Sequence, residues 1–173
     1  MSQKHLSADV VLLLFVIVLG VTIGGGLYET LVVMPLWSAA PPDSVIAFHL
    51  HNVANPQFVL DPGGRFWMFT TPLLGLLSLI SLLSGFRTDP RHRRWRTVGA
   101  GLALIVVICT FVWFVPNIIR LMSGAVTSLS RDEIASLTNW WVRLNWVRAV
   151  VYVVAWLAAL RALTISPKSG TTN

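Results

Sequence analysis

The chain alternates between long apolar runs and shorter polar segments. Four runs cover about residues 10–37, 66–86, 98–122 and 140–163. Each reaches the roughly 20 residues that an α-helix needs to cross the hydrocarbon core of a bilayer. Backbone groups find no water inside lipid, and no run alternates apolar and polar positions, so we predict helices rather than strands. The pattern therefore predicts an all-α fold, a bundle of four transmembrane helices.

The first run does not resemble a cleaved signal peptide. Such a peptide has an apolar core of about 7–15 residues followed by a cleavage site of small residues. Residues 10–37 instead form one long apolar stretch. We expect this stretch to remain as the first membrane helix.

Two segments between the runs contain local signals. Residues 38–65 form a long connection that includes Val, Ile, Phe and Leu, so we expect it to cover one end of the bundle as a cap. Within it, Asp61-Pro-Gly-Gly predicts a turn. In residues 123–139, Ser130 is followed three residues later by Glu133. This capping box predicts a helix that begins there and continues into the fourth span.

The composition fits one membrane domain over residues 1–173. The chain is 55% hydrophobic and 12% charged, whereas soluble domains carry about 25% charged residues. Its net charge of +6 does not indicate nucleic-acid binding, because the basic residues are concentrated in one short segment. The arginines of that segment are Arg87, Arg91, Arg93, Arg94 and Arg96.

Because cytoplasmic loops carry the excess of Lys and Arg, the arginine-rich segment sets the predicted orientation. It places both termini in the cytoplasm and residues 38–65 and 123–139 outside. We expect an integral protein of a bacterial cytoplasmic membrane, with the lipid bilayer as its main partner.

Ionisable side chains inside the spans are few and lie at a similar depth. Glu29 is eight residues before Trp37, and Arg148 is eight residues after Trp140. At 1.5 Å per residue, both lie about 12 Å below the outer boundary. Charged groups at such depth are costly and mark candidate sites. We predict that Glu29 and Arg148 contact each other or share a ligand; a purely structural pair is the alternative.

Other polar and aromatic residues fall in the same outer half, several of them on one face of their helix. The inner halves are almost free of polar atoms. This asymmetry predicts a pocket that opens outward or into the outer leaflet. Besides Glu29 and Arg148, we expect it to be lined by Tyr28, Trp113, Asn117, Trp141, Asn145 and Tyr152.

Glycine and proline positions predict how the helices approach one another. Gly20-x-x-x-Gly24 and the glycines that follow allow a neighbouring backbone to come close and leave room beside Glu29. Pro116 is predicted to kink the third helix and to free carbonyl groups at the same depth.

His49 and His51 form an H-x-H pair in the outer segment. In an extended segment, alternate side chains point to the same side, so the two imidazoles could hold a divalent metal. A third ligand is open among Glu29, Asp43 and Asp61, and ordinary loop histidines are the alternative. No nucleotide-binding motif occurs and no predicted span contains a histidine for haem, so the cofactor stays unknown.

Three blocks, in chain order, resemble one protein family. They are Gly25-Gly26-Leu27-Tyr28-Glu29-Thr30-Leu31-Val32 with Pro35 and Trp37, Pro116-Asn117 with Leu121, and Trp141-x-x-x-Asn145-x-x-Arg148. Together they resemble the anthrone oxygenases and their relatives, small four-helix membrane proteins mostly of unknown function. The resemblance implies insertion of oxygen at the activated methylene of an anthrone, without an evident organic cofactor.

The resemblance also implies roles for the polar residues. Glu29 would be the base that takes the methylene proton, Arg148 would hold the enolate oxygen, and Asn145 would donate a hydrogen bond. A carboxylate paired tightly with a guanidinium is a weak base, so His49 or His51 is the alternative. The residues expected to contact the flat substrate are Tyr28, Trp113, Asn117, Trp141 and Tyr152.

Two classes of function remain open at this point. One is an oxygenase or related redox enzyme, cofactor-independent or metal-dependent, that acts on a flat lipophilic phenol or quinone. The other is a non-enzymatic binding protein or an accessory subunit of a larger complex; a homo-oligomer is compatible with both. A transporter is least favoured, because the sequence shows neither inverted repeats nor broken helices at the midplane.

Overall fold

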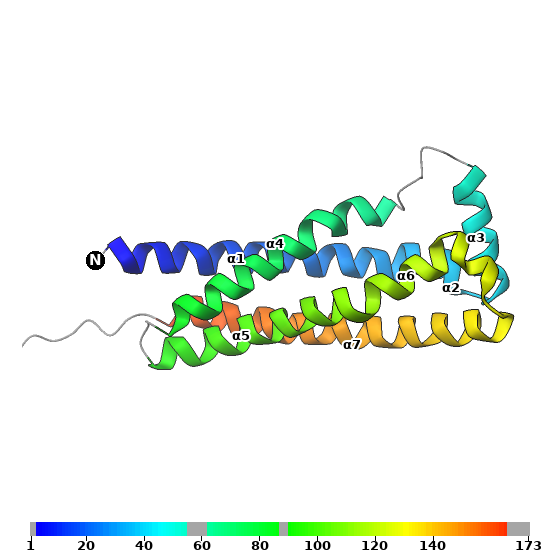
Figure 1. The fold of residues 1–173 in the computed structure, drawn as a ribbon. Coiled ribbons are helices and arrows are strands. Elements are labelled where there is room, and N and C mark those ends of the chain that lie inside the picture. The colour runs from blue at the N-terminus through cyan, green and yellow to red at the C-terminus, as the bar shows by residue number, and fades with distance from the viewer. Residues whose placement is uncertain (1–2, 55–61, 87–89, 166–173) are drawn as a thin grey trace, which may run out of the picture.

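The computed structural model describes residues 3–54, 62–86 and 90–165, and the secondary structure within these ranges is helical (Figure 1). In chain order the elements are α1 (Gln3–Tyr28), the π-helix η1 (Glu29–Val33), α2 (Met34–Ser38), α3 (Asp43–Ala54), α4 (Pro62–Gly85), α5 (Pro90–Cys109), the π-helix η3 (Thr110–Phe114), α6 (Val115–Met122), the 3₁₀-helix η4 (Gly124–Ser128) and α7 (Arg131–Thr164).

Four helical stretches are long and apolar enough to cross a membrane. They are Asp9–Ser38, Gly63–Gly85, Pro90–Met122 and Arg131–Thr164. The all-α class and the predicted number of spans are therefore confirmed, and the protein is a membrane protein. Many large apolar side chains on these helices are exposed, as expected for surfaces that face lipid.

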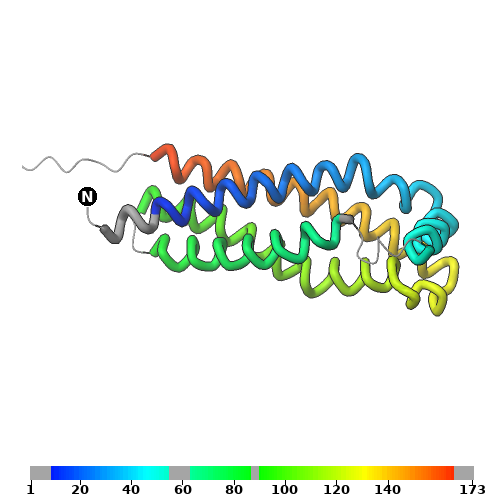
Figure 2. The backbone as a smooth tube through the Cα atoms, turned by 90° about the horizontal axis from the view of Figure 1, so that it is seen from above, coloured from blue at the N-terminus to red at the C-terminus, as the bar shows by residue number. Residues whose placement is uncertain are grey.

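The long helices form a closed ring of neighbours. α1 packs against α4 and α7, and α5 packs against the same two helices. Figures 1 and 2 show the helices running along a common axis, with the beginning of α1, the beginning of α5 and the end of α7 at one end. We call this the terminal end. The opposite end carries α3, which contacts α2 and α6, and we call it the α3 end.

The helices begin earlier than the apolar runs suggested. α4 begins at Pro62 and α5 at Pro90, because proline has no N–H to leave unbonded in a first turn. The turn predicted at Asp61-Pro-Gly-Gly is therefore wrong for residues 62–64, which begin α4; Asp61 lies outside the described residues. The arginine-rich segment is helical from Pro90 onward, and Arg87 also lies outside the described residues.

The predicted start of α7 is confirmed. The Ser130 hydroxyl accepts a hydrogen bond from the Glu133 backbone N–H at 3.2 Å, and the Glu133 carboxylate accepts one from the Ser130 N–H at 2.8 Å. These reciprocal bonds satisfy two backbone donors at the helix start. α7 then continues without a break to Thr164.

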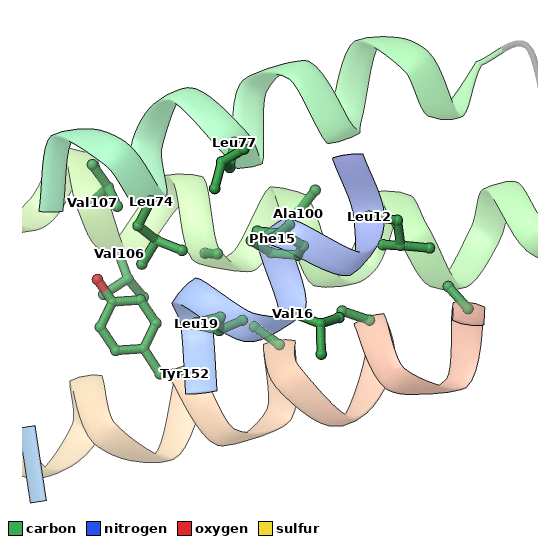
Figure 3. Close-up of a cluster of buried hydrophobic side chains, with 14 residues drawn as sticks. Leu12, Phe15, Val16, Leu19, Leu74, Leu77, Ala100, Val106, Val107 and Tyr152 are labelled. Carbon is green, nitrogen blue, oxygen red and sulfur yellow. The ribbon is translucent and has the colours of Figure 1, made fainter. Parts of the chain in front are cut away.

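The bundle has two hydrophobic clusters, one toward each end. The cluster nearer the terminal end joins α1, α4, α5 and α7 and includes Leu12, Phe15, Leu74 and Tyr152 (Figure 3). The cluster nearer the α3 end is made of Met34, Trp37, Val45, Phe114, Leu121, Val126, Ile134 and Trp141. In the second cluster, Trp37 and Phe114 meet the Trp141 ring edge-on, with centroids 5.3 and 5.6 Å away. These are favourable aromatic geometries.

The glycines of the first span contact neighbouring side chains rather than the neighbouring backbone that was predicted. A Cβ on Gly20 would lie 3.3 Å from Nε1 of Trp156, and one on Gly25 would lie 2.6 Å from Cε1 of Phe66. A Cβ on Gly24 would meet nothing within 4 Å. The close approach of a neighbouring backbone, predicted at Gly20 and Gly24, is therefore wrong: side chains contact Gly20 and Gly25, and the space beside Gly24 is open.

Candidate functional site

A hydrogen-bonded polar cluster joins α7 to the first span in the α3 half of the bundle. Nδ2 of Asn145 donates to Oγ1 of Thr30 at 2.7 Å, and the Thr30 hydroxyl donates to the Gly26 carbonyl at 2.7 Å. The Asn145 Oδ1 in turn accepts a hydrogen bond from the Arg148 guanidinium. Asn145 is 3% exposed, so this amide uses both of its polar atoms away from solvent.

Aromatic rings surround the Arg148 guanidinium. Its Cζ lies 4.4 Å from the centre of the Phe114 ring and 5.9 Å from the centres of the Trp67 and Trp141 rings. Such contacts stabilise a cation by about 0.5–2 kcal/mol each, with the larger values away from water. The guanidinium is therefore held in place by one amide and three rings.

Trp67 connects Arg148 to Glu29. The Trp67 indole N–H donates a hydrogen bond to the Glu29 carboxylate, and its ring lies near Arg148 as described above. A Cβ on Gly63 would lie 3.6 Å from Oε2 of Glu29, so the start of α4 passes close to this carboxylate. Glu29 and Arg148 thus have a common neighbour in Trp67.

A cavity of about 240 Å³ lies beside this cluster, between α1 and α7. Its lining includes four residues with polar side chains, namely Thr30, Asn145, Arg148 and Tyr152. The remaining lining residues are Thr22, Ile23, Gly26, Leu27, Trp67, Trp146, Ala149, Val150, Val153 and Val154. Several of these apolar residues are exposed, among them Val150 and Val154, so the cavity opens sideways on the surface that faces lipid.

A model of the anthrone oxygenase family matches residues 64–158, more than half of the chain. The chain belongs to the anthrone oxygenase family. No curated protein and no solved structure matches it. The matched residues include Trp67, Asn145, Arg148 and Tyr152 of the cavity, whereas Glu29 and the rest of the first span precede them.

This anthrone oxygenase family member brings only some of the predicted site residues together. Asn145, Arg148 and Tyr152 line the lateral cavity. Trp141 is buried behind the cavity and contacts Arg148, which lines it. Within the part of the chain that the structure describes, the Trp141 Nε1 has no hydrogen-bond partner. Glu29 is not among the lining residues and reaches the cavity through Trp67.

Three other predicted residues lie elsewhere in the anthrone oxygenase fold. The Tyr28 side chain is 62% exposed and does not line the cavity, because its position on the first span faces lipid. Trp113 lines a separate hollow of about 530 Å³ between α6 and α7, beside Arg120 and Glu133. Asn117 donates its amide N–H to the Trp113 carbonyl at 2.7 Å, one turn earlier on its own helix.

Two π-helical turns interrupt the regular helical period on which the predicted positions of these side chains relied. η1 begins at Glu29 and precedes Pro35, and η3 precedes Pro116. A proline ring clashes with the carbonyl four residues earlier, and a wider turn relieves that clash. Pro116 was expected to disturb the third helix, and it does so as a π-helical turn. Each extra residue in a turn changes the direction of the side chains beyond it by about 100°.

The histidine pair does not form the expected arrangement. Residues 43–54 are the helix α3 rather than an extended segment, so side chains two positions apart point in different directions. His49 is buried, with Nδ1 3.2 Å from the Met122 carbonyl, whereas His51 is exposed. Across residues 3–54, 62–86 and 90–165, no group of three or more His, Cys, Asp or Glu side chains is placed to bind a metal.

Sequence reasoning missed three residues of the site in this anthrone oxygenase relative: Trp67, Thr30 and Phe114. Trp67 stands near the beginning of a span, where tryptophan is ordinarily expected at the membrane boundary, so the sequence did not mark it as a site residue. Thr30 could have been found as the polar neighbour of Glu29 in the sequence. Nothing in the sequence marks Phe114, because an apolar residue in an apolar run has no signal of its own.

Proposed function

We propose that the protein is a membrane oxygenase that acts on a flat, lipophilic phenol- or quinone-type molecule in the lateral cavity. One observation carries the proposal: the Arg148 guanidinium lies at an apolar cavity that opens toward lipid. A lipophilic substrate dissolved in the bilayer would reach such a cavity without crossing water. A fixed cation in apolar surroundings is well suited to stabilise negative charge on a substrate oxygen.

An anthrone-type methylene is the reacting centre that the family name supports. Loss of one methylene proton leaves an anion whose charge is shared with the ring carbonyl oxygen. Electrons from this anion reduce O₂, and the carbon gains a hydroperoxide group. Loss of water then leaves a second carbonyl. Overall, the substrate loses two hydrogen atoms and gains one oxygen atom, and the other oxygen atom leaves as water.

The cavity residues have distinct proposed roles in this reaction. Arg148 holds the oxyanion, and Asn145 fixes the direction of the guanidinium. Trp67 forms a flat wall. The volume of about 240 Å³ is slightly smaller than the roughly 300–1,000 Å³ of typical ligand pockets. One or two rings of a flat molecule would therefore enter, and the remainder would lie against the exposed valines of α7.

Glu29 has two possible roles, and one pair of variants separates them. As the proton acceptor it must ionise; as a positioning group it only has to accept the Trp67 indole hydrogen bond. Glu29→Gln keeps an acceptor oxygen but cannot take the proton, whereas Glu29→Ala loses both functions. We propose that Glu29 is the proton acceptor. Activity retained by Glu29→Gln and lost by Glu29→Ala would instead establish the positioning role.

The proposal is tested by measuring oxygen consumption and quinone formation by the purified protein in nanodiscs, with an anthrone as probe. Removing one preorganised oxyanion donor typically lowers turnover by about 100-fold or more. We expect such a loss for Arg148→Gln and no loss for Arg143→Gln, which removes an exposed charge from the same helix. Ala149→Phe should block the cavity, whereas Val147→Phe adds the same ring on the exposed surface of α7.

Each outcome has a clear meaning. Turnover that survives both Arg148→Gln and Ala149→Phe, in variants that remain folded by circular dichroism, would refute the site. Probe binding that needs Arg148 but is never followed by turnover would indicate a binding or accessory protein. No binding and no turnover with any flat phenol or quinone would refute the substrate class.

We further propose that residues 1–173 form one domain in a bacterial cytoplasmic membrane, with the terminal end in the cytoplasm and the α3 end outside. The arginine-rich beginning of α5 supports this orientation. Residues 38–65 would then form an outer cap. Two observations support a cap: Val45 of α3 is fully buried, and Asp43 forms an ion pair with Arg131 of α7 at 2.7 Å.

A further inference from the structure

A second, strongly basic hollow lies at the terminal end of the bundle, far along α7 from the lateral cavity. It has a volume of about 360 Å³ and is lined by Arg91, Arg94, Trp95, Arg161, Thr164 and Ile165. Three come from the beginning of α5, two from the last turn of α7, and Ile165 follows directly after α7. Nothing in the proposed oxygenase reaction uses this hollow.

The arginines here differ from Arg96, which lies on the same helix. Arg96 is fully buried and donates to the Ser81 carbonyl at 2.9 Å and to the Ser84 hydroxyl at 2.6 Å, so it joins α5 to α4. Arg94 and Arg161 are exposed, and neither forms an ion pair with any carboxylate in the described parts of the chain. Their guanidinium groups are therefore open to a ligand from outside the protein, whereas that of Arg96 is not.

The surroundings of the hollow indicate a lipid rather than a free ion. Trp95 is 41% exposed at the point where the apolar part of α5 begins, which is a usual position for tryptophan at a membrane surface. Val98 lies one helical turn beyond Arg94, and Leu157 lies one turn before Arg161 on α7. Both are exposed apolar residues, 41% and 55% respectively, and provide surfaces for acyl chains.

We propose that this hollow binds the phosphate-bearing headgroup of an anionic lipid in the leaflet at the terminal end. Guanidinium groups bind phosphate oxygens through paired N–H donors, and basic pockets between membrane helices are known to hold such headgroups. Three arginines from two helices would bind one phosphate jointly, while Val98 and Leu157 contact the acyl chains. Binding would then hold the ends of α5 and α7 together.

The experiment uses the full-length protein in nanodiscs of phosphatidylcholine with increasing phosphatidylglycerol, and native mass spectrometry counts the retained anionic lipid. Each arginine near an anionic surface contributes enough for about a fivefold change in affinity. We expect Arg94→Gln and Arg161→Gln each to weaken retention about fivefold. Arg93→Gln is the matched control, because Arg93 is exposed on the same turn of α5 but does not line the hollow.

The proposal is supported if the two lining variants lose lipid and the Arg93 variant does not. Equal loss in all three variants would show only a general attraction between basic residues and an anionic surface, and would overturn the site. A second arm adds inorganic phosphate to nanodiscs of pure phosphatidylcholine. If phosphate alone raises the thermal stability of the wild type as much as phosphatidylglycerol does, the hollow is an anion site and the lipid proposal fails.

Discussion

Replacing Asn145 should reveal how much the polar cluster contributes to stability. Asn145→Leu keeps the size of the side chain but removes both of its hydrogen bonds, one to Thr30 and one from Arg148. A hydrogen bond between neutral groups of membrane helices contributes about 0.6 kcal/mol on average. A bond to a charged group contributes about 1.5–3 kcal/mol, and here its loss also leaves the partly buried guanidinium without an amide partner. We therefore expect Asn145→Leu to lower the free energy of unfolding by about 2–4 kcal/mol.

Two valine variants provide the scale for this measurement. Thr30→Val removes the bond from Asn145 and also the bond from the Thr30 hydroxyl to the Gly26 carbonyl. The second bond lies within the first span, so the loss of contact between spans should cost about 0.6 kcal/mol. Thr138→Val is its matched control, because the Thr138 hydroxyl is buried and has no hydrogen-bond partner among the residues described. Removing that hydroxyl should cost nothing. In the Thr30→Val/Asn145→Leu double variant, the loss should be smaller than the sum of the two single losses, because the bond between the two side chains is counted in each of them.

The assay is reversible unfolding by sodium dodecyl sulfate in mixed micelles, followed by tryptophan fluorescence. If Asn145→Leu costs no more than Thr30→Val, the bond from Arg148 contributes nothing and the guanidinium is held by the rings alone. If Thr138→Val costs as much as Thr30→Val, hydroxyl removal itself is responsible, and the reasoning from hydrogen bonds is refuted.

Two other predictions concern packing and orientation. Gly25→Ala should destabilise the protein by about 1–3 kcal/mol, because the added Cβ clashes with Phe66. In the same unfolding assay, Gly24→Ala should be neutral or slightly stabilising, because the space around Gly24 is open. Equal effects of the two variants would contradict the packing of α1. For orientation, a membrane-impermeant thiol reagent added to intact cells should label Ser44→Cys and leave Thr88→Cys unlabelled. Labelling of Thr88→Cys from outside would invert the proposed topology.

The sequence was sufficient for the spans because membrane insertion depends on length and hydrophobicity, which are local properties. The same holds for the beginning of α7, where Ser130 and Glu133 lie three residues apart and satisfy each other's backbone groups. These features need no knowledge of the neighbouring helices. They were predicted correctly for that reason.

The direction of side chains around each span was much harder to predict. In a soluble helix the polar face marks the outside, but in lipid both the buried and the exposed faces are apolar. Nothing in the sequence therefore distinguished Tyr28, which faces lipid, from Thr30, which is buried two positions later. On α7, Asn145, Arg148 and Tyr152 share one face as the spacing predicted, because the helix is unbroken and its period is regular.

The segment α3 was also missed as a helix. Its sequence between prolines suggested an irregular connection, and no membrane-length apolar run marked it. Because the segment is helical, the side chains of His49 and His51 point in different directions, whereas in an extended segment they would point to the same side. A metal site inferred from spacing thus depended on a backbone conformation that the spacing itself could not establish.

The π-helical turns before Pro35 and Pro116 have a consequence for how this chain tolerates changes in length. Each turn works as a built-in insertion of one residue, which rotates the short helix after it by about 100° relative to an uninterrupted α-helix. Trp37 and Leu121 are buried in the same cluster in that rotated setting. Deleting one residue from Glu29–Val33 would remove the extra rotation and turn Trp37 out toward lipid, although no side chain in the cluster had been replaced. Two homologous chains that differ by a single gap at this point would therefore present different residues to the same hydrophobic cluster.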